Sequence, residues 1–237
     1  MTSKSDTNGL PRERPSRLDY KWLLMLVVGM GSLLSIMDGG MVAIGSPAMI
    51  EEFHTDASAV VWVTLAFALG STAPLLTLGW VADTFGRKRM YLWGVLIVAL
   101  GLALSAVSQN VIQLIVIRVF YAVGSSMMLA NDNALLTEGF PASERGRAQG
   151  INNMAFGLGI GLGFLLGGIL VDILDWRALF WSRIPPQLVL AFLVWRFIKE
   201  DLRISHVLQD EDVVLCTDLN EGFTGGQAHG RARRVVE

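Results

Sequence analysis

Six long apolar runs, separated by short polar breaks, occupy most of the 237-residue chain. A helix needs about 20 consecutive apolar residues to cross the hydrocarbon core of a bilayer. The six candidate spans are residues 22–44, 58–82, 91–107, 111–136, 150–173 and 178–198. The last span is the least regular, because Arg183, Pro185 and Pro186 lie inside it. Membrane helices tolerate proline when neighbouring groups satisfy the freed backbone, so the pattern predicts an all-α membrane protein with six transmembrane helices.

The composition agrees with this pattern. Hydrophobic residues make up 52% of the chain and charged residues 17%, whereas soluble domains carry about 25% charged residues. The charges are over-represented in two polar flanks, residues 1–21 and 199–237, on either side of the six-span body 22–198. We predict both flanks to be cytoplasmic tails. Two origins stay open for the second flank, a genuine tail or the out-of-frame end of a longer protein.

Lysine and arginine are concentrated in alternate breaks between the spans. The N-terminal flank, the second break and the fourth break carry most of them, whereas the first and third breaks carry none. The basic residues of the second and fourth breaks are Arg87, Lys88, Arg89, Arg145 and Arg147. Because positive loops stay in the cytoplasm, we expect a multi-pass cell-membrane protein with both termini on the cytoplasmic side.

Two opposite charges lie at similar depth in the apolar body. A charge at the bilayer centre costs at least about 2.5–3.5 kcal/mol, so it usually has a partner or faces a water-filled cavity. At a rise of 1.5 Å per residue, Asp38 lies roughly 25 Å up the first span and Arg118 roughly 12 Å down the fourth. In a core roughly 30 Å thick these depths differ by about 7 Å. We predict an Asp38–Arg118 pair or a shared polar cavity; helix packing alone, or an Arg118 side chain extended to the interface, is the simpler alternative.

Two further features of the spans have mainly structural interpretations. Asp132 lies near the cytoplasmic end of the fourth span, where we expect the carboxylate to be solvated. Gly159, Gly163 and Gly167 recur at four-residue spacing in the fifth span, followed by Gly168. Small residues on one helix face let another backbone approach closely, so we expect tight packing rather than a ligand site.

The break between the second and third spans carries a motif. Gly79 is followed at fixed intervals by Asp83 and Gly86, and then by the basic triplet that begins at Arg87. Gly86 permits a tight turn, and Asp83 can cap or pair at a helix end. This pattern resembles the signature loop of the major facilitator superfamily, which occupies the same position. Three further segments resemble the fourteen-span drug:proton antiporter branch of this family. They contain Asp38 near the end of the first span, Arg118 in the fourth span, and residues 140–147 with Glu144.

The resemblance covers roughly residues 18–199 and implies that the six helices form the N-terminal half of a major facilitator fold. It further implies transport by alternating access, as proton-coupled efflux of drugs or lipophilic cations. Asp38 and Arg118 would then belong to the proton-coupling apparatus or substrate cavity, and residues 79–89 would gate the cytoplasmic side. Phe164 replaces the proline that marks antiport in that branch, which leaves the transport mode open.

Six spans amount to about half of such a transporter, and three interpretations stay open. The chain is a truncated transporter that lacks its C-terminal half, a half-size form that dimerises through the glycine face of the fifth span, or a non-transporting membrane protein that binds or regulates a partner. The expected partners are the lipid bilayer and a small-molecule substrate with protons.

Several function classes have no support in the sequence. It contains no nucleophile–base constellation or phosphate-binding loop, so we expect no enzyme activity and no cofactor. One cysteine, Cys216, and three scattered histidines offer no metal-ligand spacing. No basic face indicates a nucleic-acid partner.

Overall fold

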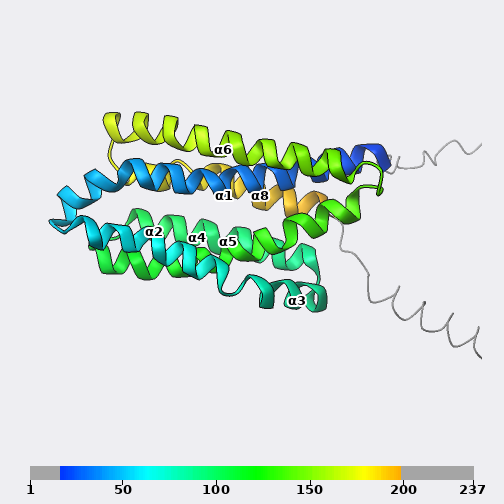
Figure 1. The fold of residues 1–237 in the computed structure, drawn as a ribbon, viewed down its shortest axis with the longest axis horizontal. Coiled ribbons are helices and arrows are strands. Elements are labelled where there is room, and N and C mark those ends of the chain that lie inside the picture. Colours follow the sequence, from blue (N-terminus) through cyan, green and yellow to red (C-terminus); the bar gives the residue numbers. More distant parts are fainter. Residues whose placement is uncertain (1–16, 199–237) are drawn as a thin grey trace, which may run out of the picture. The chain divides into compact units, whose positions relative to one another are not determined.

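The computed structural model describes residues 17–198, with the side chains of residues 17–20 and of Leu76, Asp83 and Glu138 outside that description. These residues form eight helices and no strand. The helices are α1 (Arg17–Phe53), α2 (Ala57–Thr72), α3 (Leu75–Phe85), α4 (Arg87–Ala106), α5 (Val111–Gly139), α6 (Arg145–Ile173), α7 (Ala178–Trp181) and α8 (Ile184–Phe197). They run lengthwise as one bundle (Figure 1). The predicted cytoplasmic tail 199–237 lies outside the described residues.

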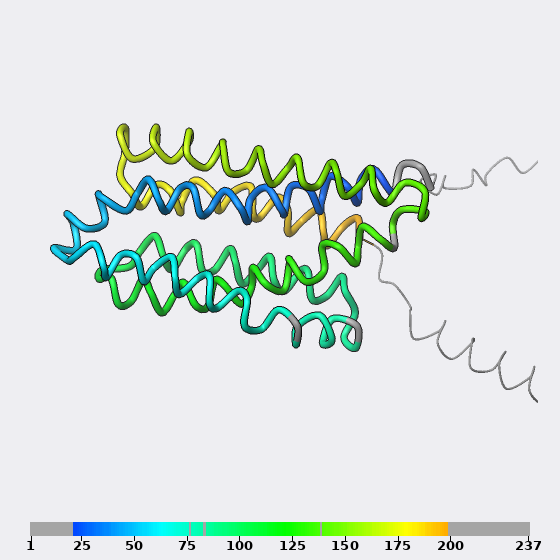
Figure 2. Tube along the Cα trace, viewed as in Figure 1, coloured from blue at the N-terminus to red at the C-terminus, as the bar shows by residue number. Residues whose placement is uncertain are grey.

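Five helical segments are long and apolar enough to cross a membrane, with α7 and α8 counted as one segment, and α2 is a shorter apolar helix. The prediction of an all-α membrane fold is therefore confirmed. The second predicted span consists of two helices, because Pro74 has no backbone N–H and crowds the preceding turn. The tube bends between α2 and α3 at this point (Figure 2).

The last predicted span is also divided. The short helix α7 ends at Trp181, and α8 begins at Ile184 after Arg183. Pro185 and Pro186 lie in the first turn of α8, where a missing N–H removes no intrahelical hydrogen bond. The break thus places Arg183 at a helix start, and its side chain is buried in the bundle.

A face of α6 made of glycines packs directly on α1, and the two helices run side by side (Figures 1 and 2). A Cβ atom added at Gly163 would lie 2.5 Å from the backbone oxygen of Met37, and one added at Gly159 would lie 2.7 Å from that of Leu33. Gly167 is likewise buried against α1. The three glycines are therefore needed because the backbones of α1 and α6 almost touch.

Two expectations about these glycines need correction. Nothing lies within 4 Å of the position where Gly168 would carry a Cβ atom, so Gly168 does not belong to the packed face. The predicted dimer interface through this face is wrong, because α1 of the same chain already covers it.

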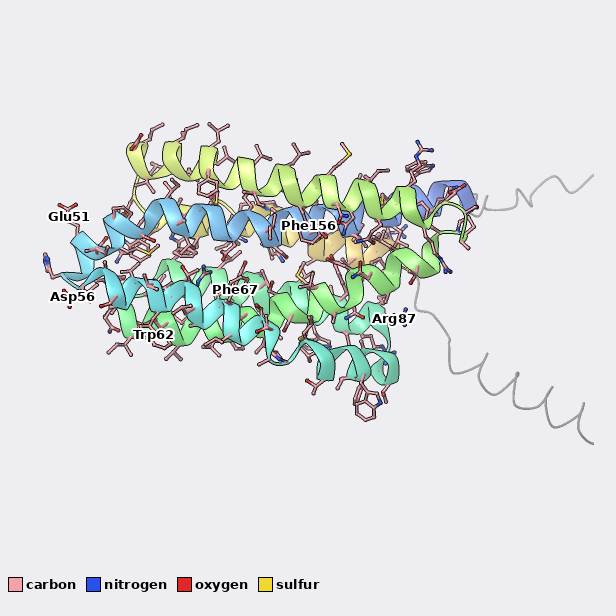
Figure 3. The ribbon with its side chains drawn as sticks, viewed as in Figure 1. Glu51, Asp56, Trp62, Phe67, Arg87 and Phe156 are labelled. Carbon is pink, nitrogen blue, oxygen red and sulfur yellow. The ribbon has the colours of Figure 1, made fainter. Side chains whose placement is uncertain are left out.

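The loops gather at two ends of the bundle. The start of α1, the α3–α4 turn, the α5–α6 loop and the end of α8 share one end (Figure 1). Arg87 lies at that end, whereas Glu51 and Asp56 lie at the other (Figure 3). The basic and acidic loops are therefore on opposite sides, although the membrane orientation itself stays a prediction.

Contacts from α1 tie down the loops at each end. At the basic end, Lys21 Nζ lies 2.6 Å from a Glu144 carboxylate oxygen, and Arg147 stacks over Trp22 at 5.7 Å. The Nε–H of Arg145 donates to the backbone oxygen of Phe140 over 3.3 Å. These contacts fix the α5–α6 loop against the start of α1.

At the acidic end, the Glu52 carboxylate accepts hydrogen bonds from Trp176 Nε1 and from Arg177. Arg177 also donates to the backbone oxygen of Ser108 over 3.3 Å. Burial acts to lower the pKa of Arg177, but the hydrogen bond and charge of Glu52 outweigh it and raise that pKa. The ion pair therefore stays charged and joins the end of α1 to two loops.

We expect Gly163→Val to destabilise the bundle, because its side chain would collide with backbone atoms of α1. Overpacking of this kind costs typically about 1–3 kcal/mol, and more where backbone must move. The thermal unfolding midpoint of the purified chain in detergent measures the loss. Gly161→Val is the matched control on the same helix, since nothing lies within 4 Å of its Cβ position. Equal losses in the two variants would contradict the close contact.

Candidate functional site

Three charged side chains meet in the interior of the bundle. Asp38 comes from α1, Arg118 from α5, and Arg183 from the break before α8. Their exposed fractions are 0%, 1% and 2%, so the rest of the chain shields all three side chains from solvent. We call these three residues the charge triad.

The Asp38 carboxylate lies between the two guanidinium groups. Arg118 donates from both terminal nitrogens, NH1 to Oδ1 over 3.1 Å and NH2 to Oδ2 over 2.7 Å. Such two-pronged contacts between arginine and carboxylate are among the strongest hydrogen-bonded ion pairs. Arg183 donates to the same Oδ1. One carboxylate therefore holds both cations.

Arg183 also binds groups beyond the carboxylate. Its NH2 group donates to the backbone oxygen of Leu34 over 2.7 Å and to the hydroxyl of Tyr121 over 2.9 Å. Leu34 lies one turn before Asp38 on α1, and Tyr121 lies one turn after Arg118 on α5. Arg183 thereby bridges α1 and α5 from a third segment.

Aromatic rings surround the Arg118 guanidinium. Its central carbon lies 5.0 Å from the ring centre of Tyr121 and 5.6 Å from those of Phe67 and Phe180. Phe67 points toward the bundle interior from α2, whereas Trp62 on the same helix points outward (Figure 3). Rings at these distances attract a guanidinium through cation–π interactions and keep water away from the triad.

The triad carries one negative and two positive charges. The Nε atoms of Arg118 and Arg183 are both buried without a hydrogen-bond partner. A buried charge without compensation is costly, so the arrangement depends on Asp38 remaining ionised. Loss of that charge would leave two adjacent buried cations, which makes the triad a charge-sensitive contact between three helices.

The contact between Asp38 and Arg118 was predicted from their depths, but the part played by Arg183 was missed. The sequence contained a usable signal. Counted from residue 178, where the last predicted span begins, Arg183 lies roughly 8 Å below the outer face of the membrane. Arg118 lies roughly 12 Å below the same face. The same depth calculation would have grouped the two arginines.

A second polar cluster lies farther along α5. Asp132 is 3% exposed and its Oδ2 accepts a hydrogen bond of 2.9 Å from the Ser32 hydroxyl of α1. Tyr91 of α4 faces the same carboxylate. The expectation that Asp132 is solvated is wrong, because α1 and α4 cover it.

The loop motif occupies the end of α3, the turn and the start of α4. Gly86 has a φ of +94°, a left-handed conformation that favours glycine, as the tight turn required. Gly79 has open space around its Cβ position, and the side chain of Asp83 lies outside the described part. Arg87, Lys88 and Arg89 form the first turn of α4. A gating role for these residues stays a prediction.

The described residues contain no group of histidine, cysteine, aspartate or glutamate that could hold a metal ion. The candidate site consists of two buried polar clusters, the charge triad and the cluster around Asp132, and α5 contributes Arg118 to the first and Asp132 to the second. Both also involve α1, so α1 and α5 form the framework of the site.

Comparison with known proteins identifies the family of this bundle. Residues 28–215 match the family described as the Major Facilitator Superfamily. The riboflavin transporter RibZ of Clostridioides difficile is 33% identical over 76% of this chain and 40% of its own length. Multidrug resistance protein 3 of Bacillus subtilis is 30% identical over 73% of this chain and 34% of its own. The chain thus spans less than half the length of these relatives.

A solved structure of a D-xylose-proton symporter shares the fold, with a TM-score of 0.70 at 18% identity, over 84% of this chain and 53% of that one. That likeness concerns the fold alone. The sequence match covers most of the helical bundle. The chain is a multi-pass membrane protein that belongs to the Major Facilitator Superfamily, a family of transporters rather than enzymes.

Proposed function

We propose that this chain forms the N-terminal half of a proton-coupled efflux transporter for drugs or lipophilic cations. The observation that carries the proposal is the charge triad, which is buried inside a major facilitator bundle and joins α1, α5 and the start of α8. Charged residues inside membrane spans are costly and are usually functional. Three of them in one contact are therefore unlike ordinary helix packing.

The proposed mechanism is alternating access, in which two six-helix halves rock against each other around a central site. Asp38 becomes available to a proton or a cationic substrate only when the arginines separate from it. Occupancy of the carboxylate and the arrangement of the helices are therefore linked, as in any ligand-driven population shift. Arg118 and Arg183 would rearrange whenever Asp38 is neutralised.

Residues 79–89 supply the proposed cytoplasmic gate. The tight turn at Gly86 presents the start of α4 at the basic end of the bundle. We assign Asp83, with Arg87 and Lys88, to contacts that close this side of the transporter. Both chain termini would face the cytoplasm, in agreement with the basic residues at that end.

The relatives' names support a small organic substrate, since one is named for riboflavin and another for multidrug resistance. Export is proposed from the resistance names. Phe164 occupies the position of the antiporter proline, and α6 runs through it without a break. The opposing wall of the cavity would come from a C-terminal half, or from a second copy that uses a face other than the glycine face of α6.

Transport of ethidium, a fluorescent lipophilic cation, tests this function. Efflux-deficient bacteria would express the chain alone or together with the second half of Multidrug resistance protein 3. We expect cells that express both halves to accumulate less ethidium than cells that express the chain alone. In the Asp38→Asn variant, the pH dependence of this efflux should be lost. Asp172→Asn is the matched control, because Asp172 is exposed on α6. Unchanged pH dependence in Asp38→Asn would rule out the coupling role.

The same cells distinguish the alternatives. Efflux by the chain alone, together with a cross-linked homodimer on a blue-native gel, would favour a half-size dimeric transporter. Ethidium accumulation that no combination changes would contradict the transport proposal and favour a membrane protein that binds or regulates a partner.

A further inference from the structure

We propose that Asp132, together with Ser32 and Tyr91, forms a proton-binding site that is separate from the charge triad and occupied in the conformation described here. This inference rests on the proposed transport function for its biological meaning, since it names a carrier for the coupled proton. Proton occupancy itself can be measured on the chain alone.

The carboxylate of Asp132 is enclosed but only half satisfied. Its Oδ2 accepts the hydrogen bond from Ser32, whereas its Oδ1 is buried without a partner. The hydroxyl of Tyr91, also fully buried, has no hydrogen-bond partner of good geometry although it faces this carboxylate. A protonated Oδ1 would donate to the Tyr91 hydroxyl oxygen, whereas an ionised Oδ1 would accept from the Tyr91 O–H.

The surroundings of Asp132 are neutral. α1 contributes the Ser32 hydroxyl, which donates to the carboxylate, and α4 contributes the Tyr91 phenol, which faces it. On α5 itself, the neighbouring Asn131 donates to the backbone oxygen of Met127 instead. No lysine, arginine or histidine of any of the eight helices, among the described side chains, forms an ion pair with Asp132.

The two buried aspartates therefore differ in what stabilises them. Asp38 is held by two guanidinium groups, which favour its ionised form. Asp132 has only neutral partners, and a buried carboxylate without a counter-charge tends to take up a proton rather than stay ionised. While the triad is closed, Asp132 is thus the better proton carrier of the two.

The positions of the two clusters indicate how protonation of Asp132 can affect the charge triad. Arg118 and Asp132 are roughly 21 Å apart along α5, and Ser32 and Asp38 are roughly 9 Å apart along α1. Both clusters therefore bridge the same two helices. Release of the proton would place an uncompensated charge between α1 and α5, which favours hydration and a rearrangement of the contact that the triad also spans.

Infrared difference spectroscopy of the purified chain in lipid nanodiscs, recorded as the pH is raised, tests the site. We expect a protonated-carboxyl C=O band at neutral pH that disappears under alkaline conditions. Asp132→Asn should remove this band, whereas the exposed control Asp172→Asn should keep it. Absence of the band in the unaltered chain at neutral pH, or its persistence in Asp132→Asn, would overturn the proposal.

Further variants keep the test informative if Asp132→Asn folds poorly. Ser32→Ala removes a donor that stabilises the ionised carboxylate, so the titration midpoint should move to higher pH. Tyr91→Phe should shift the band frequency, because the protonated carboxyl loses its acceptor. No change in either variant would place the protonated group elsewhere.

Three outcomes separate this inference from its alternatives. Loss of the band at neutral pH when sodium replaces potassium would identify a sodium site and overturn the proton proposal. A band assigned to Asp132 in a chain that supports no transport would count against the proposed function and leave the proton site standing. Proton-coupled transport without that band would count against the proton site alone.

Discussion

The burial of Asp38 between two arginines is the constraint on which the rest of the bundle depends. A guanidinium inside an apolar bundle needs an anion and hydrogen-bond acceptors, and a single carboxylate serves both Arg118 and Arg183. This requirement brings α1, α5 and the start of α8 to one point. The break between α7 and α8 places Arg183 at a helix start, and from there its side chain reaches the carboxylate.

The glycine face of α6 packs against the side of α1 that faces away from α5. The charge triad draws α1 toward α5, while Gly159 and Gly163 let α6 approach α1 on its other side without a clash. α1 therefore lies between two helices, with a polar contact toward α5 and a backbone contact toward α6. A shift of α1 at the triad would disturb its backbone contact with α6, because packed interiors hold little free space.

Much of this architecture was predictable from sequence. The spans, the turn at Gly86 and the contact between Asp38 and Arg118 follow from helix length, glycine conformation and the rise per residue. Other features depend on which helices become neighbours, and spacing alone does not contain that information. The four-residue glycine spacing predicted close packing but not α1 as its partner. Depth near a membrane face predicted solvation of Asp132, whereas burial is decided by the helices that cover it.

A double-mutant cycle on Asp38 and Arg183 tests the central claim most directly. The unfolding free energies of Asp38→Asn, Arg183→Gln and the double variant would be measured on the purified chain in detergent. If the carboxylate holds Arg183 in place, the two substitutions are coupled by about 1–3 kcal/mol, as expected for residues in one ion-pair network. Effects that add to within about 0.5 kcal/mol would contradict the account, since independent sites behave in that way.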